Sequence, residues 1–145
     1  MASFVYNEFK RAIAAGEIAL DTDTISVRLV MSTTTVDTEN DGIATLSDFN
    51  SIAVCNGANY VDKNLADLAV TKVDGSDLAK FDATDVTWTA LGVGGATTQG
   101  ALIYKNLSSD SDNVPIAFIE FASAVTHDGS DFTIQWSASG ILTLT

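Results

Sequence analysis

The chain has 145 residues, 46% of them hydrophobic, so it is long enough to bury the core of one domain and too apolar to stay disordered. Its 19 acidic and seven basic residues give a net charge of -12, which repels nucleic-acid phosphates and anionic membranes. A single cysteine excludes an internal disulfide or a multi-cysteine metal site. No apolar run is long enough to span a bilayer, and residues 1–9 lack the pattern of a signal peptide. We therefore expect one domain over residues 1–145, made in a cytoplasm, with no nucleic-acid or membrane partner.

The first element that the sequence predicts is a short helix over residues 4–15, with Ser3 as its N-cap. A helix this short is stable only when its apolar side packs on another surface, either its own sheet or a neighbouring molecule. We therefore expect residues 3–15 to form an N-terminal arm and helix outside the strand core. The apolar stripe of this helix consists of Val5, Phe9, Ala12 and Ile13.

Short strands separated by turns are predicted for most of the remaining chain. Apolar side chains alternate with Ser26 and Arg28 over residues 25–31, and this period of two is typical of a strand. Residues 32–49 are polar, and we expect a long loop with little regular structure there. Further strands are expected at residues 68–73, 81–84, 86–90, 101–105 and 116–121.

Residues 131–145 have the clearest strand pattern of the chain. Phe132, Ile134 and Trp136 alternate with polar residues, and Gly140 ends a turn after which residues 141–145 return as a second strand. We expect these two strands to pair as a β-hairpin that Phe132 and Trp136 anchor in the core. The whole pattern predicts a mainly β fold, an antiparallel β-sandwich or barrel-like domain with one short N-terminal helix.

Residues 37–48 have part of the acidic spacing of a calcium-binding loop. Asp37, Glu39 and Asp41 precede Gly42, and Asp48 takes the twelfth place, where a hard cation requires converging oxygen ligands. Glu39 stands where Asp or Asn is usual, and Asp48 stands where the longer, bidentate Glu is usual. A solvated acidic loop is the other interpretation, and these departures favour it.

Other residues that could support catalysis or bind a cofactor lack the patterns that this chemistry requires. Gly92, Gly94 and Gly95 follow a strand, but the third glycine of a dinucleotide fingerprint is missing, which favours a flexible loop. His127 is the one histidine and lies in a polar turn, where a surface position is the simplest interpretation. Cys55 has no sign of an activated thiolate. The sequence therefore predicts no catalytic residue and no cofactor.

Four aromatic residues could line a sugar-binding face if they lay exposed on one side of a sheet. Aromatic side chains on alternating strand positions are more often part of the core. Both interpretations apply to Tyr60, Trp88, Tyr104 and Trp136.

Segments spread along the whole chain share one family resemblance. The first are YNEFK at residues 6–10 and GEIALDTDTISVRLV at residues 16–30. They are followed by VTWT at 86–89, LIYK at 102–105, DFTIQW at 131–136 and GILT at 140–143. In this order they resemble a family of small virion proteins from tailed phages. The resemblance is weakest over residues 32–68.

This resemblance implies a structural protein of the virion, with head decoration, or cement, as the favoured role. Such a protein binds the outer surface of the capsid and stabilises the shell, so the expected partner is the major capsid protein. It also implies a homo-oligomer, with a trimer favoured. The alternatives are a phage tail or fibre component and a carbohydrate-binding β-sandwich module. The resemblance implies no catalytic residue, so we expect no enzyme activity.

Contacts with the capsid or with other copies are expected from the N-terminal arm and from the long loop. Both lie outside the expected strand core and contain aromatic residues, which dominate the binding energy of many interfaces when exposed. The alternative for each is ordinary packing on its own sheet. The contact candidates are Ser3, Phe4, Tyr6, Phe9 and Phe49.

Overall fold

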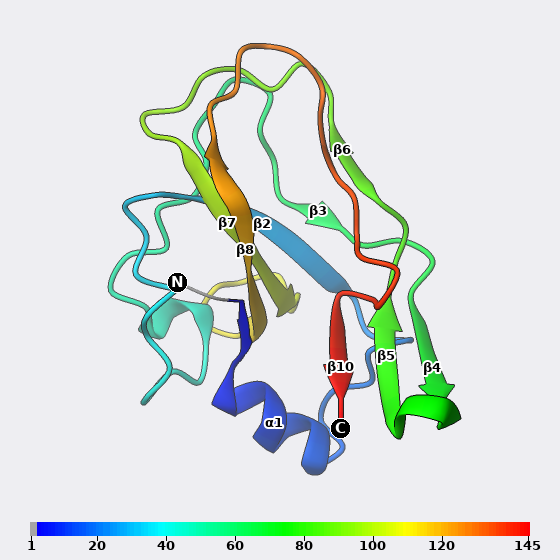
Figure 1. Cartoon of the computed structure of the whole chain (residues 1–145). Coiled ribbons are helices and arrows are strands. Elements are labelled where there is room, and N and C mark those ends of the chain that lie inside the picture. The colour runs from blue at the N-terminus through cyan, green and yellow to red at the C-terminus, as the bar shows by residue number, and fades with distance from the viewer. Residues whose placement is uncertain (1–2) are drawn as a thin grey trace.

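The computed structural model describes residues 3–145 and confirms a mainly β fold with antiparallel strand pairing and, in that range, one α-helix. A five-stranded sheet has the order β1 (Phe4–Val5), β8 (Val114–Val125), β7 (Thr98–Lys105), β2 (Ile25–Met31) and β3 (Lys63–Asn64). A three-stranded sheet has the order β10 (Leu142–Leu144), β5 (Leu78–Asp82) and β4 (Ala69–Val73). A two-stranded sheet pairs β6 (Val86–Trp88) with β9 (Phe132–Ile134). Figure 1 shows the smaller sheets standing beside the large one, as in a β-sandwich.

The strands expected at residues 25–31, 68–73, 86–90, 101–105 and 116–121 are confirmed, with ends that differ by a few residues. The strand expected at residues 81–84 overlaps β5, which begins earlier, at Leu78. The remaining regular elements of the described chain are helical: α1 (Asn7–Ala14) and the 3-10 turns η1 (Leu46–Asp48) and η2 (Asp74–Ser76).

Strand β2 is the centre of the fold, because all seven of its residues are buried. Ile25, Val27 and Leu29 point into one hydrophobic core, and Val30 points into a second core on the other face of the sheet. An alternating sequence usually marks a strand with one solvated face, but here the intervening Ser26 and Arg28 are buried too. The large sheet is therefore covered on both faces.

The first core lies between the large sheet, helix α1 and the smaller sheets. Phe9 and Ala12 are the buried residues of α1, and they join a core that also contains Trp88 of β6 and Phe81 of β5. The indole Nε1 of Trp88 donates a hydrogen bond of 2.7 Å to the carbonyl oxygen of Val61, so the one polar atom of this fully buried ring is satisfied.

The second core is formed by the loop over residues 32–52, which covers the other face of the large sheet. Residues 32–49 were expected to form a loop with little regular structure, and the 3-10 turn η1 is the one helical element within them. The buried side chains of the loop pack on residues of β2, β7 and β8, and the phenolic hydroxyl of Tyr6 donates a 2.6 Å hydrogen bond to the carbonyl of Val36. The buried residues of this core are Tyr6, Val30, Val36, Ile43, Leu46, Phe49, Leu102, Tyr104 and Phe118.

The N-terminal segment differs from the expected helix over residues 4–15. Phe4 and Val5 pair with Phe118 and Ala117 of β8, and the helix begins only at Asn7. Ser3 is not the N-cap: its hydroxyl oxygen instead accepts a hydrogen bond of 2.9 Å from the backbone N–H of Glu120. Pairing with an open strand edge overrides the local helical pattern, because it satisfies backbone groups of both strands.

The hairpin expected over residues 131–145 is wrong. β9 pairs with β6, whereas β10 pairs with β5, so the two strands lie in different sheets. The turn before β10 is present, with Gly140 at φ 88° and its N–H bonded to the carbonyl of Ser137 at 2.8 Å. After that turn the N–H of Ile141 donates to the carbonyl of Phe81 at 2.7 Å, which directs the chain to the other sheet.

The tyrosine that joins the N-terminal arm to the loop should measurably stabilise the fold. Tyr6→Phe removes the hydroxyl and leaves the buried carbonyl of Val36 without this donor, so we expect a loss of about 1–3 kcal/mol in the free energy of unfolding. Urea denaturation measures this loss. Thr133→Val is a matched control, because it removes a hydroxyl that is hydrogen-bonded to Thr87 on the surface. A Tyr6→Phe loss no larger than that of Thr133→Val would contradict the account.

Candidate functional site

The most highly connected polar cluster of the described chain surrounds Arg28 of β2. Its Nε lies 2.7 Å from a carboxylate oxygen of Asp62, and its two terminal nitrogens lie 2.9 and 3.0 Å from the two oxygens of Asp110. The Arg28 side chain is 10% exposed, against 26% for Asp62 and 42% for Asp110. A nearly buried guanidinium is therefore neutralised by two carboxylates that reach the solvent.

Two tyrosines complete this cluster. The hydroxyls of Tyr60 and Tyr104 each donate a 2.8 Å hydrogen bond to Asp62, and the guanidinium carbon of Arg28 lies 5.2 Å from the centre of the Tyr104 ring. Burial, together with the negative charge of Asp62, raises the pKa of Tyr104 to about 12 and also raises the pKa of Tyr60. Both phenols therefore stay protonated at neutral pH and act as donors.

The Arg28 cluster joins parts of the chain that are distant in sequence. Asp62 precedes β3, and Asp110 lies in the loop between β7 and β8. The hydrogen bonds of Arg28 hold the pKa of the Asp110 carboxyl below its usual range, so this pair remains ionised under mildly acidic conditions. Each polar group already has a protein partner, and the arrangement fits a structural clamp between two loops and the central strand.

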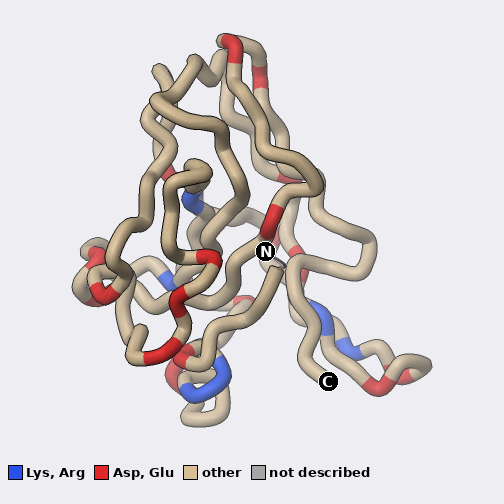
Figure 2. The backbone as a smooth tube through the Cα atoms, turned by 60° about the vertical axis from the view of Figure 1, so that its left-hand side comes forward, with Lys and Arg blue, Asp and Glu red and all other residues tan. Residues whose placement is uncertain are grey.

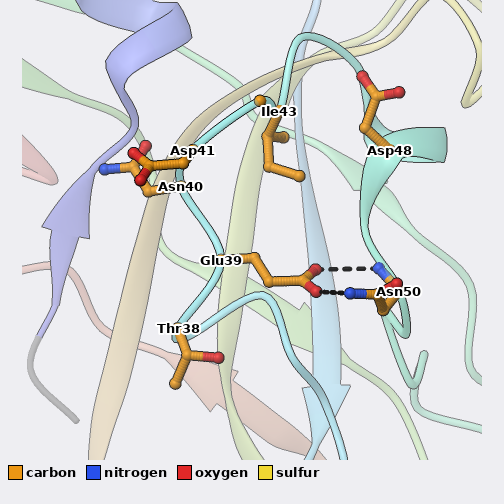
Figure 3. Close-up of a pocket in the computed structure, with 8 residues that line it drawn as sticks. Thr38, Glu39, Asn40, Asp41, Ile43, Asp48 and Asn50 are labelled. Atoms are coloured by element: carbon orange, nitrogen blue, oxygen red, sulfur yellow. Dashed lines mark hydrogen bonds between the residues drawn. The ribbon is translucent and has the colours of Figure 1, made fainter.

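A hollow of about 480 Å³ lies on the acidic loop, where the sequence has part of a calcium pattern. Figure 3 shows that the carboxylate of Glu39 points at Asn50, whereas Asp41 and Asp48 lie on opposite sides of the hollow. Glu39 accepts hydrogen bonds from both the backbone and the side-chain nitrogen of Asn50. Asp48 accepts from the backbone N–H groups of Ala44 and Thr45, which lower the pKa of its carboxyl.

The four calcium candidates do not form a set of ligands. Asp37 is 8% exposed and accepts a hydrogen bond from the side-chain amide of Gln99 at 3.0 Å. Across residues 3–145, no group of three or more His, Cys, Asp or Glu side chains is placed to bind a metal ion. The carboxylates of Asp37, Glu39 and Asp48 each accept hydrogen bonds from a different part of the protein, which explains why the acidic spacing does not produce a converging site.

His127 is buried, contrary to the expectation of a surface position. Its Nε2 lies 2.8 Å from the hydroxyl of Thr98, and its ring packs edge-on against Phe132 with centroids 4.8 Å apart. Burial lowers the pKa of His127, and the nearby charge of Asp128 acts in the opposite direction as a smaller effect. The histidine therefore connects the end of β8 to β7 and β9 in its neutral form.

The aromatic residues that could have formed a sugar-binding face are mostly internal. Trp88 is fully buried, Tyr104 is 2% exposed, and Tyr60 stacks on Trp88 with centroids 6.1 Å apart. Trp136 is half-buried, and its indole nitrogen donates to the carbonyl of Thr84 at 3.1 Å. These four residues thus serve the core and do not form one exposed platform.

The glycine-rich loop is used for close packing against another loop. A side chain at Gly57 would lie 2.1 Å from the carbonyl oxygen of Gly92, so neither backbone leaves room for a Cβ between them. The N–H of Gly95 donates to the side chain of Asn56 at 2.7 Å. Cys55, next to this contact, is buried and unpaired.

The contact candidates fall into two groups. Tyr6 and Phe9 are fully buried and Phe49 is 7% exposed, so the expectation that these aromatic side chains are available to a partner is wrong. They are buried because Tyr6 and Phe49 pack in the second core and Phe9 packs in the first core. Ser3 is exposed and Phe4 is half-buried, and these two remain accessible candidates.

The chain matches no protein-family model, no curated protein and no solved structure. None of the helices within residues 3–145 has the length and apolar character needed to cross a membrane.

Removing the charge of Arg28 should destabilise the protein strongly. Arg28→Met leaves Asp62 and Asp110 without their cation, and we expect a loss of about 3 kcal/mol in the free energy of unfolding, as for other broken buried pairs. Lys72→Met is the matched control, because it breaks an exposed pair with Asp74, where we expect a loss of about 0–1 kcal/mol. Equal losses in the free energy of unfolding of the two variants would mean that the ion pairs of Arg28 do not stabilise the fold.

The neutral, buried His127 should make stability fall on mild acidification. The folded protein holds this group below its usual pKa of 6.5, so the unfolded chain binds more protons as the pH drops. The stabilisation is complete above pH 6.5 and decreases from there toward the lower pKa of the folded state. Thermal unfolding at pH 7.5 and pH 5.5, values on either side of the ordinary histidine pKa, should show a smaller decrease in His127→Gln than in the unmodified protein. An identical decrease in both would exclude this role for His127.

Proposed function

We propose that this chain is a structural virion protein of a tailed phage, a head decoration protein that binds the outer surface of the capsid. The observation that carries the proposal is the ordered resemblance from YNEFK at residues 6–10 to GILT at residues 140–143. Much of the resemblance falls on α1, β2, β6, β7 and β9. Its weakest part, residues 32–68, is mostly loop.

A decoration protein acts by adding buried surface across the junctions between capsomers. Any expansion or opening of the shell must then break additional contacts, so the bound protein shifts the equilibrium toward the closed shell. Each copy contributes one modest interface, and many symmetric copies together increase the stability of the closed shell. A rigid unit with a doubly covered sheet suits this role, because little ordering of the chain is required when it binds.

The strong negative charge supports binding to a basic surface of the major capsid protein. Figure 2 shows acidic residues on several loops and few basic residues. With 19 acidic against seven basic residues, free copies repel one another and repel packaged DNA. A basic surface on the outside of the capsid would increase the rate at which the protein associates with it and would favour binding to that outer surface.

The accessible parts of the N-terminal arm are the proposed contact elements. Ser3 and Phe4 lie at the outer edge of the large sheet, beside β8. A hollow next to them is lined by apolar side chains of β8 and of the segment before β10, including Ile119 and Ile141. Apolar contacts in this hollow would add affinity to the charge complementarity of the acidic surface.

The test is to add the purified protein to capsids that lack it and to locate the bound copies by electron microscopy. The proposal predicts saturable binding of many copies at capsomer junctions, weakened by salt because the charges are screened. Phe4→Ala should lower the affinity. Val93→Ala, which changes an exposed apolar residue on a different loop, is the control and should leave it unchanged. No binding, or a few copies at the tail, would overturn the proposal; saturable binding to glycans would favour a carbohydrate-binding module.

A further inference from the structure

Strand β4 lies at the open edge of its sheet and is longer than the other edge strands of the described chain. The sheet order β10-β5-β4 leaves its outer side without a partner among residues 3–145. The other strands at the edges of sheets, namely β1, β3, β10, β6 and β9, have only two or three residues each, whereas β4 has five. Short edge strands are a common protection against pairing with other chains. In Figure 1 the β4–β5 hairpin extends away from the large sheet, at the lower right.

The hydrogen bonds of β5 show which backbone groups of β4 face outward. The carbonyl of Phe81 accepts a bond from the N–H of Ile141, so the backbone of Phe81 points toward β10. Its partner in β4, Val70, therefore belongs to a pair without mutual hydrogen bonds, and the N–H and C=O of Val70 point away from β5. The same holds for Lys72, two residues further along, whereas Thr71 between them bonds to β5.

The strands of this sheet carry less negative charge than the chain as a whole. Strands β4, β5 and β10 contain two basic residues, Lys72 and Lys80, and one acidic residue, Asp82. The turn between β4 and β5 adds Asp74 and Asp77, so the charges of the hairpin nearly balance. The whole chain, by contrast, has 19 acidic and seven basic residues. Figure 2 shows the basic residues of this hairpin at the lower right, with acidic residues nearby. Two copies that pair through this sheet therefore bring together surfaces whose charges nearly balance, which limits their mutual repulsion.

We propose that β4 pairs with β4 of a second copy of this chain, antiparallel, with the two-fold axis at Thr71. In this register Val70 of each copy faces Lys72 of the other, and both pairs exchange the two hydrogen bonds that these residues direct outward. A shift that places Lys72 opposite Lys72 brings like charges together and is disfavoured. The three-stranded sheets of the two copies become one continuous sheet across the axis.

This pairing is self-complementary, so it closes with two copies. It gives a dimer in place of the trimer that the family resemblance implies. The contact involves one short strand from each side, and we expect a weak, concentration-dependent association of the kind found for small interfaces. The proposal stands whether or not the protein binds a capsid, and its test needs no capsid.

Cysteine cross-linking tests the register directly. The two copies of Thr71 would form a pair without mutual hydrogen bonds, with Cα atoms about 4.5 Å apart, within the range that a disulfide spans. Thr71→Cys should therefore form a disulfide dimer under mild oxidation at high protein concentration. The native Cys55 is buried, so it does not compete. Lys72→Cys is the matched control: it lies on the same exposed strand but faces Val70, and we expect several-fold less dimer.

A second measurement does not depend on cysteine chemistry. Lys72→Pro removes an outward N–H without removing a hydrogen bond to β5, and proline is tolerated at such edge positions. Sedimentation velocity should show dimer in the unmodified protein at high concentration, and less dimer in Lys72→Pro, with circular dichroism confirming that both are folded. Equal cross-linking of Thr71→Cys and Lys72→Cys would overturn the proposal. So would a monomer at all concentrations, or a trimer that Lys72→Pro leaves intact.

Discussion

The structure depends on burial of strand β2 on both faces, since every residue of this strand is shielded from solvent. One face packs on helix α1 and the smaller sheets, and the other packs on the loop over residues 32–52. Apolar burial at about 25 cal/mol per Å² is the main driving force for folding, so covering a second face adds a second source of stability. The loop is consequently a structural element, although it has almost no regular secondary structure.

Burying Arg28 in this strand imposes a further requirement. A charge removed from water is costly unless it is paired and hydrogen-bonded, and here Asp62, Asp110 and the ring of Tyr104 meet that need. The partners come from two separate loops, so the clamp forms only when β2, β3 and β7 are already aligned. Specific polar pairing thus selects one arrangement of a core that apolar contacts alone would specify less tightly. The result is a rigid unit in which, among residues 3–145, β4 is the longest strand at the edge of a sheet.

Local periodicity predicted most of the strands, because alternation over residues such as Phe132 and Ile134 requires only neighbours in sequence. Long-range pairing was not predictable in this way. Nothing in the order of residues 131–145 shows that β9 joins β6 while β10 joins β5. The partners of Arg28 are 34 and 82 residues away, and an arginine between apolar residues looks like a solvated position. The spacing of Val36, Ile43, Leu46 and Phe49 was a usable sign that the loop contributes to a core. The proposed function class rests on the resemblance alone. The four acidic calcium candidates show that spacing in the sequence does not by itself bring carboxylates together.

Native-state hydrogen exchange tests the double coverage of the central sheet most directly. The backbone N–H groups of Thr35, Leu46 and Ser47 are hydrogen-bonded to the carbonyls of Ser51, Asn113 and Asp110 beneath or beside the second core. If the loop is part of that core, these amides exchange slowly, with protection approaching that of β2 and β7. Rapid exchange of the loop amides, with protection restricted to the strands, would show that the second face is open to solvent and would contradict this account.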